Sequence, residues 1–258
     1  MCGKRVVIVE HDGITHIGKT YPFQQKLMNF CMKYANEIIF LTDFVKDRVP
    51  KALIKNKKIY VVPHGLYDFN GLERVPKMYS QTPNILFFGR IDSYKGLDLL
   101  IEALKTIPSS LYHKFIIAGK SHIVYDTSGL DSNKLQILDD FLSQAEIVTL
   151  FNKSHILVMP YIGASQSGVA SIAIANCIPT VCTNVGGLGE QFRLDADGRE
   201  CALMCEPNVK SIAQALHTLL GDKALYEKLS FDLSLRAEEL SWDKIAIKIQ
   251  NILTNDEN

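Results

Sequence analysis

The stretch NILFFGRIDSYKGLDLLIEAL, residues 84–104, decides the fold class. Its first part, NILFFG (84–89), is a short apolar run typical of a strand buried on both faces. A turn carrying Arg90, Lys95 and Gly96 follows, and from Leu97 onward apolar residues recur at helical spacing. A buried strand followed at once by an amphipathic helix is the repeating unit of a parallel α/β sheet.

The same alternation runs along the rest of the chain. Seven more runs are typical of buried parallel strands: RVVIVE (5–10), EIIFLT (37–42), KIYVVP (58–63), KFIIAG (114–119), HILVMP (155–160), PTVCTN (179–184) and ALMCEP (202–207). Helical spacing marks residues 24–35, 43–54, 97–106, 148–154, 169–176, 211–220, 223–240 and 242–253. The pattern predicts an α/β protein with doubly wound parallel sheets. Eight strands are too many for one half of a two-domain protein, so we expect them to be shared between two domains.

Residues 66–83 break the alternation with Gly71, Pro76 and Pro83 and show no apolar periodicity, so we place a domain boundary there. The last helix is amphipathic, with Ile245, Ile249 and Ile252 on one face, and needs a surface to lie on. The expected division is 1–75 for a first domain, 76–240 for a second, and 241–258 for a C-terminal helix that packs back on the first.

The amino-acid composition disfavours several classes of function. The 258 residues are 47% hydrophobic and 22% charged, as in an ordinary globular protein with a large core. The 28 Lys and Arg balance the 28 Asp and Glu, so no global field favours nucleic acid, and we expect no nucleic-acid partner. The six cysteines form no CxxC pair, and no run approaches the roughly 18 apolar residues of a membrane helix. We therefore expect a cytoplasmic protein.

Arg90 and Lys95 are the strongest candidate site residues. They follow a strand and precede a helix, which is where α/β sheets bind phosphates, and together they could hold a diphosphate. The alternative is that both are solvated loop charges.

Two further segments follow strands in the same way. Ser165, Gln166, Ser167 and Gly168 open a helix and offer backbone N–H groups and hydroxyls to an anion or a sugar, or they are plain helix caps. In the segment 186–190, Gly187 allows close backbone approach and Glu190 can accept bonds from hydroxyls; the alternative is a tight turn with a capping carboxylate.

His11, with Asp12, His16 and Gly18, lies just past the first strand. A histidine there can polarise a sugar hydroxyl or bind a metal, but no HExxH or comparable ligand spacing accompanies it, so we expect no metal. All these segments lie at carboxyl ends of strands, where open α/β sheets bind ligands.

Several segments together resemble the donor-binding half of the family-4 retaining glycosyltransferases of the GT-B fold. They are GRIDSYKGLDLLIEAL, FIIAG, LFNKSHILVMPY, NCIPTVCTNVGGLGE and VVPHGLYD, within a resemblance from about Val6 to Leu253. The resemblance implies a Rossmann-like donor domain plus the remnant of a second, Rossmann-like acceptor domain. It also implies that Arg90 and Lys95 bind the diphosphate of a nucleotide sugar, with no cofactor or metal. HDGITHIG resembles the family's HD…H.G segment, which implies that His11 lies near the transferred sugar.

The chain departs from the family in two ways. Ala164 and Ile172 stand where the two glutamates of the family's E-x7-E motif belong. A subgroup with an SQSG-type loop also lacks these glutamates, and resemblance to it implies that residues 165–168 contact the donor. Glu190 is then a candidate to bind the ribose in their place. The acceptor half is also roughly a hundred residues short of a full domain. The chain is expected to be a truncated enzyme, a natural half that needs a partner chain, or a fragment.

Three functions remain open. The first is a glycosyltransferase that moves a sugar, with retention, from a nucleoside diphosphate sugar to a glycan or lipid-linked acceptor, as in polysaccharide biosynthesis. The second is a donor-binding subunit, inactive without a partner chain, and the third is a GT-B sugar-nucleotide epimerase. The basic stretch from Lys46 to Lys58 is either a solvated face or a peripheral contact with the inner face of the membrane.

Overall fold

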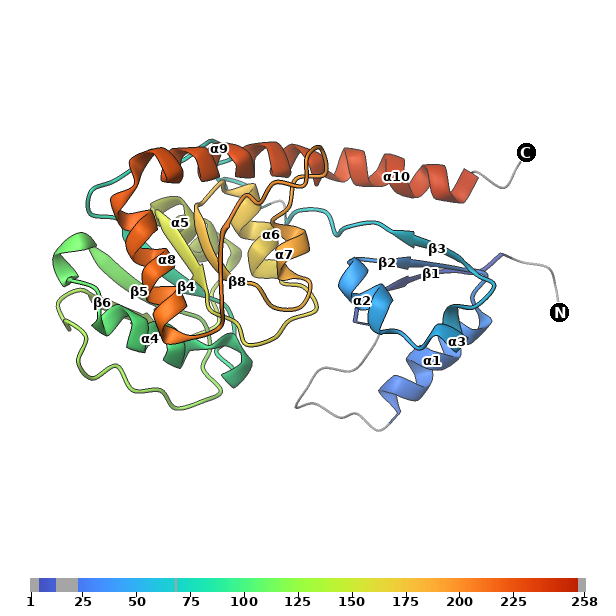
Figure 1. Cartoon of the computed structure of the whole chain (residues 1–258), viewed down its shortest axis with the longest axis horizontal. Helices are drawn as coiled ribbons and strands as arrows, with labels where there is room; N and C mark the ends of the chain where they lie inside the picture. The colour runs from blue at the N-terminus through green and yellow to red at the C-terminus, as the bar shows by residue number, and fades with distance from the viewer. Residues whose placement is uncertain (1–4, 13–22, 68, 255–258) are drawn as a thin grey trace. The chain divides into compact units, whose positions relative to one another are not determined.

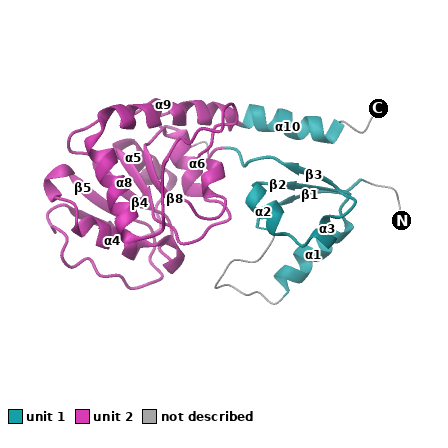
Figure 2. Ribbon diagram, viewed as in Figure 1, with its two compact units in different colours: residues 1–65, 242–258 teal, residues 66–241 magenta. Residues whose placement is uncertain are grey.

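The computed structural model describes residues 5–12, 23–67 and 69–254. They divide into two compact units, 1–65 with 242–258 (unit 1) and 66–241 (unit 2), coloured separately in Figure 2. The first boundary therefore falls at 65/66 rather than at 75/76. The reason is that the segment 69–83 packs on unit 2: the Lys77 amide donates to Ser230 Oγ (2.6 Å), and the Tyr79 hydroxyl donates to the Leu220 carbonyl (2.6 Å).

Unit 1 is a three-stranded parallel sheet in the order β1-β2-β3, with helices around it. Its elements are β1 (Val7–Glu10), α1 (Gln24–Tyr34), β2 (Glu37–Phe40), α2 (Asp43–Arg48), α3 (Lys51–Ile54), β3 (Lys58–Val61) and α10 (Trp242–Thr254). Its core includes Met32, Ile38, Phe40 and Val45, all fully buried.

The helix expected over 43–54 is two helices. The Thr42 side chain caps α2 by accepting from the Val45 amide (3.2 Å). Val49 then turns extended ahead of Pro50, because a residue before proline is disfavoured in helical conformation.

The C-terminal helix belongs to unit 1. The Arg5 guanidinium donates to the carbonyl of Ile252 (2.7 Å) at the end of α10 and, in the same unit, to both oxygens of Glu37 (2.6 and 2.8 Å). At the start of α10 the Trp242 ring lies so close to Gly65 that a Cβ there would sit 2.7 Å from it. A side chain at position 65 would therefore displace the ring.

Unit 2 is a six-stranded parallel sheet in the order β6-β5-β4-β7-β8-β9, covered by helices (Figure 1). The strands are β4 (Asn84–Phe88), β5 (Lys114–Ala118), β6 (Leu135–Leu138), β7 (Ile156–Met159), β8 (Thr180–Thr183) and β9 (Leu203–Cys205). The helices are α4 (Leu97–Lys105), α5 (Gln144–Lys153), α6 (Gly168–Ala175), α7 (Leu188–Gln191), α8 (Val209–Gly221) and α9 (Lys223–Glu239). Helix α4 packs with α8 and α6 with α9, as in a doubly wound sheet.

Three features of unit 2 differ from the expectation. Strand β6 was not expected, because an edge strand with partly exposed residues lacks a continuous buried run. Helix α5 starts at Gln144 rather than 148, since Ser143 and Glu146 form a reciprocal capping box. Residues 188–191 form the short helix α7 where a turn was one alternative.

Cys177, Cys182, Cys201 and Cys205 are buried and unpaired, and burial raises the pKa of Cys177 and of Cys205 to about 11. They pack as small apolar residues. None of the helices in the described ranges is long and apolar enough to cross a membrane.

Candidate functional site

The candidate site of unit 2 lies where the strand order reverses. From β4 the chain proceeds outward through β5 and β6, whereas β7, β8 and β9 extend the sheet on the other side of β4. Strands β4 and β7 are hydrogen-bonded neighbours, so the loops that follow them diverge at this topological switch point. Ligands of open α/β sheets bind in the crevice at such a point. Arg90 and Lys95 follow β4, and residues 165–168 follow β7.

Lys95 is held in a tight turn. It ends a short 3₁₀ turn, Ser93–Lys95, and Gly96 then adopts φ of +66° to start α4. A Cβ on Gly96 would lie 1.9 Å from the Pro160 carbonyl oxygen, so only glycine permits this approach of the β4 loop to the end of β7.

The Lys95 ammonium is buried: the residue is only 7% exposed. Its Nζ donates to the Tyr161 hydroxyl (2.5 Å) and lies 3.8 Å from the centroid of the same ring. Burial, with the nearby charge of Arg90 acting in the same direction and Asp92 opposing both, lowers the pKa of Lys95 from its ordinary value near 10.5 to about 7. Among the described residues Lys95 forms no ion pair. It is therefore not a solvated loop charge.

Arg90 is more open. Its side chain is 45% exposed, and Nε lies 2.6 Å from Asp92 Oδ2. A hydrogen bond with Tyr94 raises the pKa of Arg90, and Asp92 does the same, so the guanidinium stays charged. The β4 loop thus presents one exposed cation beside one buried cation.

The loop 165–168 meets Lys95 through Tyr161. The hydroxyls of Tyr161 and Ser167 lie 3.3 Å apart, and both residues are buried. Ser167 occupies the N-cap position of α6, yet its side chain makes no capping bond, so it does not act as a plain cap. Gly168 leaves room for Tyr67, because a Cβ there would lie 2.8 Å from that ring.

Gln191 fastens the loop from the other side. Its side-chain oxygen accepts from the Ser167 amide (2.7 Å), and its side-chain nitrogen donates to the Ser167 carbonyl (3.2 Å). The side-chain amide of Gln191 thus bonds both backbone polar groups of Ser167, as the backbone of a neighbouring strand does. The three motifs after β4, β7 and β8 are joined in one chain of contacts, Lys95–Tyr161–Ser167–Gln191.

Gly186 and Gly187 carry the loop after β8. Gly186 has φ of +59°, and a Cβ there would lie 1.7 Å from the Ala164 carbonyl oxygen; the Gly187 amide donates to the same oxygen (3.1 Å). Glu190, half-buried, lies in α7, and its carbonyl accepts from Arg236 (3.3 Å). The two glycines therefore hold the β8 loop against the β7 loop.

Arg236 of α9 supports α7 from behind. It is 3% exposed, donates through Nε to the Gln191 carbonyl (3.0 Å), and pairs with Asp195 (2.6 Å) and Glu239 (2.8 Å). Sequence reasoning missed Tyr161, Gln191 and Arg236, because each lies in an ordinary helix or strand end and carries no motif of its own.

His11 belongs to unit 1. It follows β1, and its Nδ1 lies 3.1 Å from Asp12 Oδ1. This hydrogen bond raises the pKa of His11, with the charge of Asp12 adding to it, while burial acts in the opposite direction. His16 and Gly18 lie outside the described residues. Within the described ranges, no group of three or more His, Cys, Asp or Glu could hold a metal ion.

Comparisons with known proteins agree on one family. The family model "Glycosyl transferases group 1" matches residues 82–222, over half of the chain. An uncharacterized glycosyltransferase of Methanocaldococcus jannaschii is 25% identical over 229 residues, which cover 86% of this chain and 62% of that protein. The capsular polysaccharide biosynthesis glycosyltransferase CapM of Staphylococcus aureus is 24% identical over 256 residues, covering 90% of this chain and 65% of that protein. The chain thus spans less than two thirds of the length of both relatives.

A solved structure shares the fold. Anabaena HepE in complex with UDP aligns with a TM-score of 0.76 at 15% identity, covering 98% of this chain and 72% of that one. The α/β architecture with parallel sheets is that of the GT-B glycosyltransferases, as expected.

Proposed function

The chain belongs to the group 1 family of glycosyl transferases, and from this premise we propose that it moves a sugar, with retention, from a nucleoside diphosphate sugar to a glycan or lipid-linked acceptor. The observation that carries the proposal is the buried Lys95 ammonium beside Arg90 at the switch point of the unit 2 sheet. A buried cation that forms no ion pair in the described chain favours an anionic ligand. The UDP complex of the structurally similar HepE supports a nucleoside diphosphate as that anion.

The proposed chemistry needs charge and position more than a protein nucleophile. The bond from the anomeric carbon to the donor phosphate oxygen breaks, and a bond from that carbon to the acceptor oxygen forms on the same face. The acceptor proton passes to the released diphosphate, which balances the step. Arg90 and Lys95 stabilise the negative charge that develops on the diphosphate.

The loop 165–168 is proposed to contact the donor with its amides and hydroxyls. The absence of a capping bond at Ser167 and the two bonds from Gln191 support this role, because they show a loop held in place by its neighbours. Glu190 and Gly187, on the next loop, are proposed to bind near the ribose. His11 is proposed to lie near the transferred sugar, on the strength of the family resemblance.

A second function is a donor-binding subunit that works with a partner chain. The observation in its favour is that, among the described strands, β1 lies at an edge of the unit 1 sheet and pairs with β2 alone, and that Val9 is 60% exposed. Parallel sheets are ordinarily larger and covered, so strands from another polypeptide could extend this one.

Calorimetry with a panel of nucleoside diphosphate sugars tests the donor site. We expect Arg90→Ala to weaken binding of the preferred donor by roughly ten- to a hundredfold, because one charge-assisted contact contributes about 1.5 to 3 kcal/mol. Lys210→Ala, which removes an exposed cation from α8, is the matched control and should bind as the wild type does. Equal affinity in Arg90→Ala and the control would refute the assignment.

Assays of transfer and donor hydrolysis separate the two functions. The isolated chain is compared with the chain co-expressed with the products of neighbouring genes. Transfer by the isolated chain supports the enzyme, whereas donor binding with transfer only after co-expression supports the subunit.

A further inference from the structure

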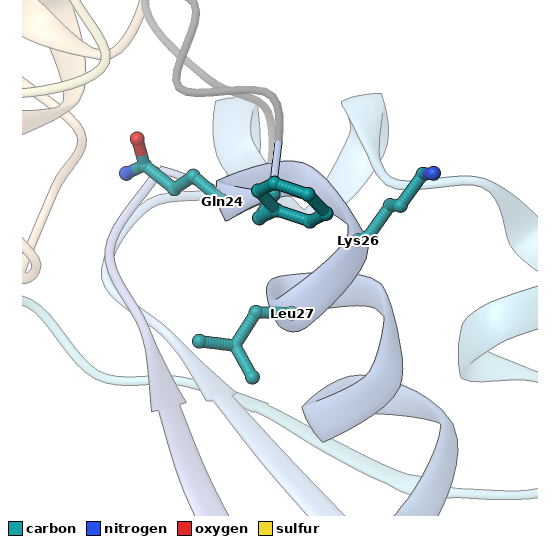
Figure 3. A pocket seen from close by; sticks show the side chains of 4 residues that line it. Gln24, Lys26 and Leu27 are labelled. Carbon is teal, nitrogen blue, oxygen red and sulfur yellow. The ribbon is translucent and has the colours of Figure 1, made fainter.

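The pocket on α1 and the switch point of unit 2 offer a ligand different groups. Four exposed residues line the pocket, which Figure 3 shows from close by: Phe23, Gln24, Lys26 and Leu27. At the switch point the polar side chains are buried: Lys95 is 7%, Ser167 6% and Tyr161 1% exposed. Because a buried polar group needs a hydrogen-bond partner, the direction of each bond at the switch point can be worked out.

Tyr161 is fixed at the end of β7. Its carbonyl accepts from Thr183 Oγ1 (2.6 Å) in β8, and the amide of the next residue, Ile162, donates to the Tyr94 carbonyl (2.8 Å) in the β4 loop. The Tyr161 ring also meets the Tyr94 ring edge-on, with centroids 6.3 Å apart. The phenol therefore has little freedom to move its hydroxyl.

The bond between Lys95 and Tyr161 can run in one direction only. An ammonium group has N–H donors and no acceptor, so Lys95 Nζ donates and the Tyr161 hydroxyl oxygen accepts, at 2.5 Å. Burial raises the pKa of Tyr161, so the phenol keeps its own proton. That proton needs an acceptor, and among the described residues Ser167 Oγ, 3.3 Å away, is the one within reach. The reverse order would leave a buried phenolic proton without a partner, which costs free energy.

Ser167 therefore accepts from Tyr161 and has its own proton left to give. Its side chain makes no capping bond to α6, and Gln191 already bonds its backbone N–H and C=O groups. Within the described ranges Tyr161 is the one side chain bonded to Ser167 Oγ. The Ser167 hydroxyl lies at the start of α6, where backbone amides without intrahelical partners favour an anion. An acceptor oxygen on a bound anion would complete the chain of bonds.

From these observations we infer that Tyr161 is a positioning residue: it orders the bonds from Lys95 through Tyr161 to Ser167, so that the Ser167 hydroxyl donates to an anionic oxygen of the bound donor. The inference rests on the proposed function, since it takes the ligand to be a nucleoside diphosphate. Successive hydrogen bonds that start at a cation polarise one another, so the positive charge of Lys95 strengthens Ser167 as a donor. In this role Tyr161 acts through its two neighbours rather than by contact with the ligand.

Nucleotide binding tests the inference. Calorimetry of the full chain uses UDP, GDP and ADP as probes, and the variants are measured with the one that binds most tightly. Tyr161→Phe keeps the ring and removes only the oxygen, and we expect it to weaken binding roughly tenfold; Ser167→Ala should do the same. Because the two side chains act in one chain of bonds, the double variant should lose roughly ten- to thirtyfold rather than the roughly hundredfold loss of independent sites.

Tyr226→Phe is the matched control. Tyr226 is also fully buried, and its hydroxyl donates to the carbonyl of His155 (2.9 Å), which precedes β7 and so lies at the opposite end of that strand from the switch point. The control should lower the melting temperature about as much as Tyr161→Phe does while leaving nucleotide affinity unchanged. A purely structural role for Tyr161 predicts instead that the two variants bind alike.

A titration of Lys95 tests the first bond without any nucleotide. The probe is the NMR signal of isotope-labelled lysine Cε, assigned by its loss in Lys95→Met. Tyr161→Phe removes the acceptor of the ammonium but leaves in place the other groups that face it, Arg90, Asp92 and Tyr94. The midpoint should therefore fall by about one pH unit, whereas the control variant should leave it unchanged.

Two results would overturn the inference. One is a nucleotide affinity of Tyr161→Phe that equals that of the wild type, or losses that multiply in the double variant. The other is an unchanged Lys95 midpoint in Tyr161→Phe. A wild type that binds none of the three nucleotides would instead refute the proposed function, and the Lys95 midpoint would then decide whether Tyr161 orders the bonds.

Discussion

Replacing Lys95 with methionine should stabilise the protein and abolish tight donor binding at the same time. Burial lowers the pKa of Lys95 from near 10.5 to about 7. A shift of this size means that the charged form costs the folded state about 5 kcal/mol as an upper figure. Methionine fills a similar volume without charge but loses the hydrogen bond to Tyr161, so we expect a net gain of about 2 kcal/mol at pH 7.

The sign of the pH dependence makes the prediction specific. Because the folded-state pKa of this lysine is depressed, its destabilising effect is complete below about pH 7 and fades as the pH rises toward 10.5. Thermal unfolding of Lys95→Met should therefore show a melting temperature roughly 4 to 8 °C above that of the wild type at pH 6 and a smaller difference at pH 10. Leu99→Met, a change at a half-buried position of α4, is a control for the effect of methionine. A gain independent of pH, a loss of stability, or unchanged affinity for the donor would refute the reasoning.

Three further predictions follow from the site. Donor affinity should fall roughly tenfold between pH 6 and pH 8, because the anionic donor binds the protonated form of Lys95. Calorimetry in buffers of different ionisation enthalpy should detect proton uptake on binding near neutral pH, and an affinity that does not change with pH would contradict this prediction. Gly168→Val should weaken donor binding at least roughly tenfold, because its side chain would meet the Tyr67 ring, whereas Gly221→Val, where space is open, should not alter donor binding. Gln191→Leu should lower donor affinity by roughly fivefold to fiftyfold by freeing Ser167, with little change in melting temperature; equal losses of both would indicate a purely structural role.

The sequence by itself determined the class of the fold and the positions of most elements. All eight expected strands form, as short apolar runs between turn residues and helices favour in a parallel sheet. The expectation that all are buried is wrong for β1 and β3, which are partly exposed because they are the two edge strands of the three-stranded sheet. The order of motif and element also places Arg90 and Lys95 after a strand. What the sequence missed at this level, such as β6, is an edge strand whose partly exposed residues leave no periodic signal.

Only the tertiary structure decided which loops meet. Strand order is not encoded in local pattern: β4 and β7 are far apart in the sequence, yet their pairing creates the switch point. The same holds for the burial of Lys95 on Tyr161, since a pKa depends on every group packed around the charge. It holds as well for α1, whose Phe30 has the spacing of a core residue in the sequence but lies on the exposed face. Periodicity reveals that a helix has apolar faces, but which face is covered depends on what packs against it.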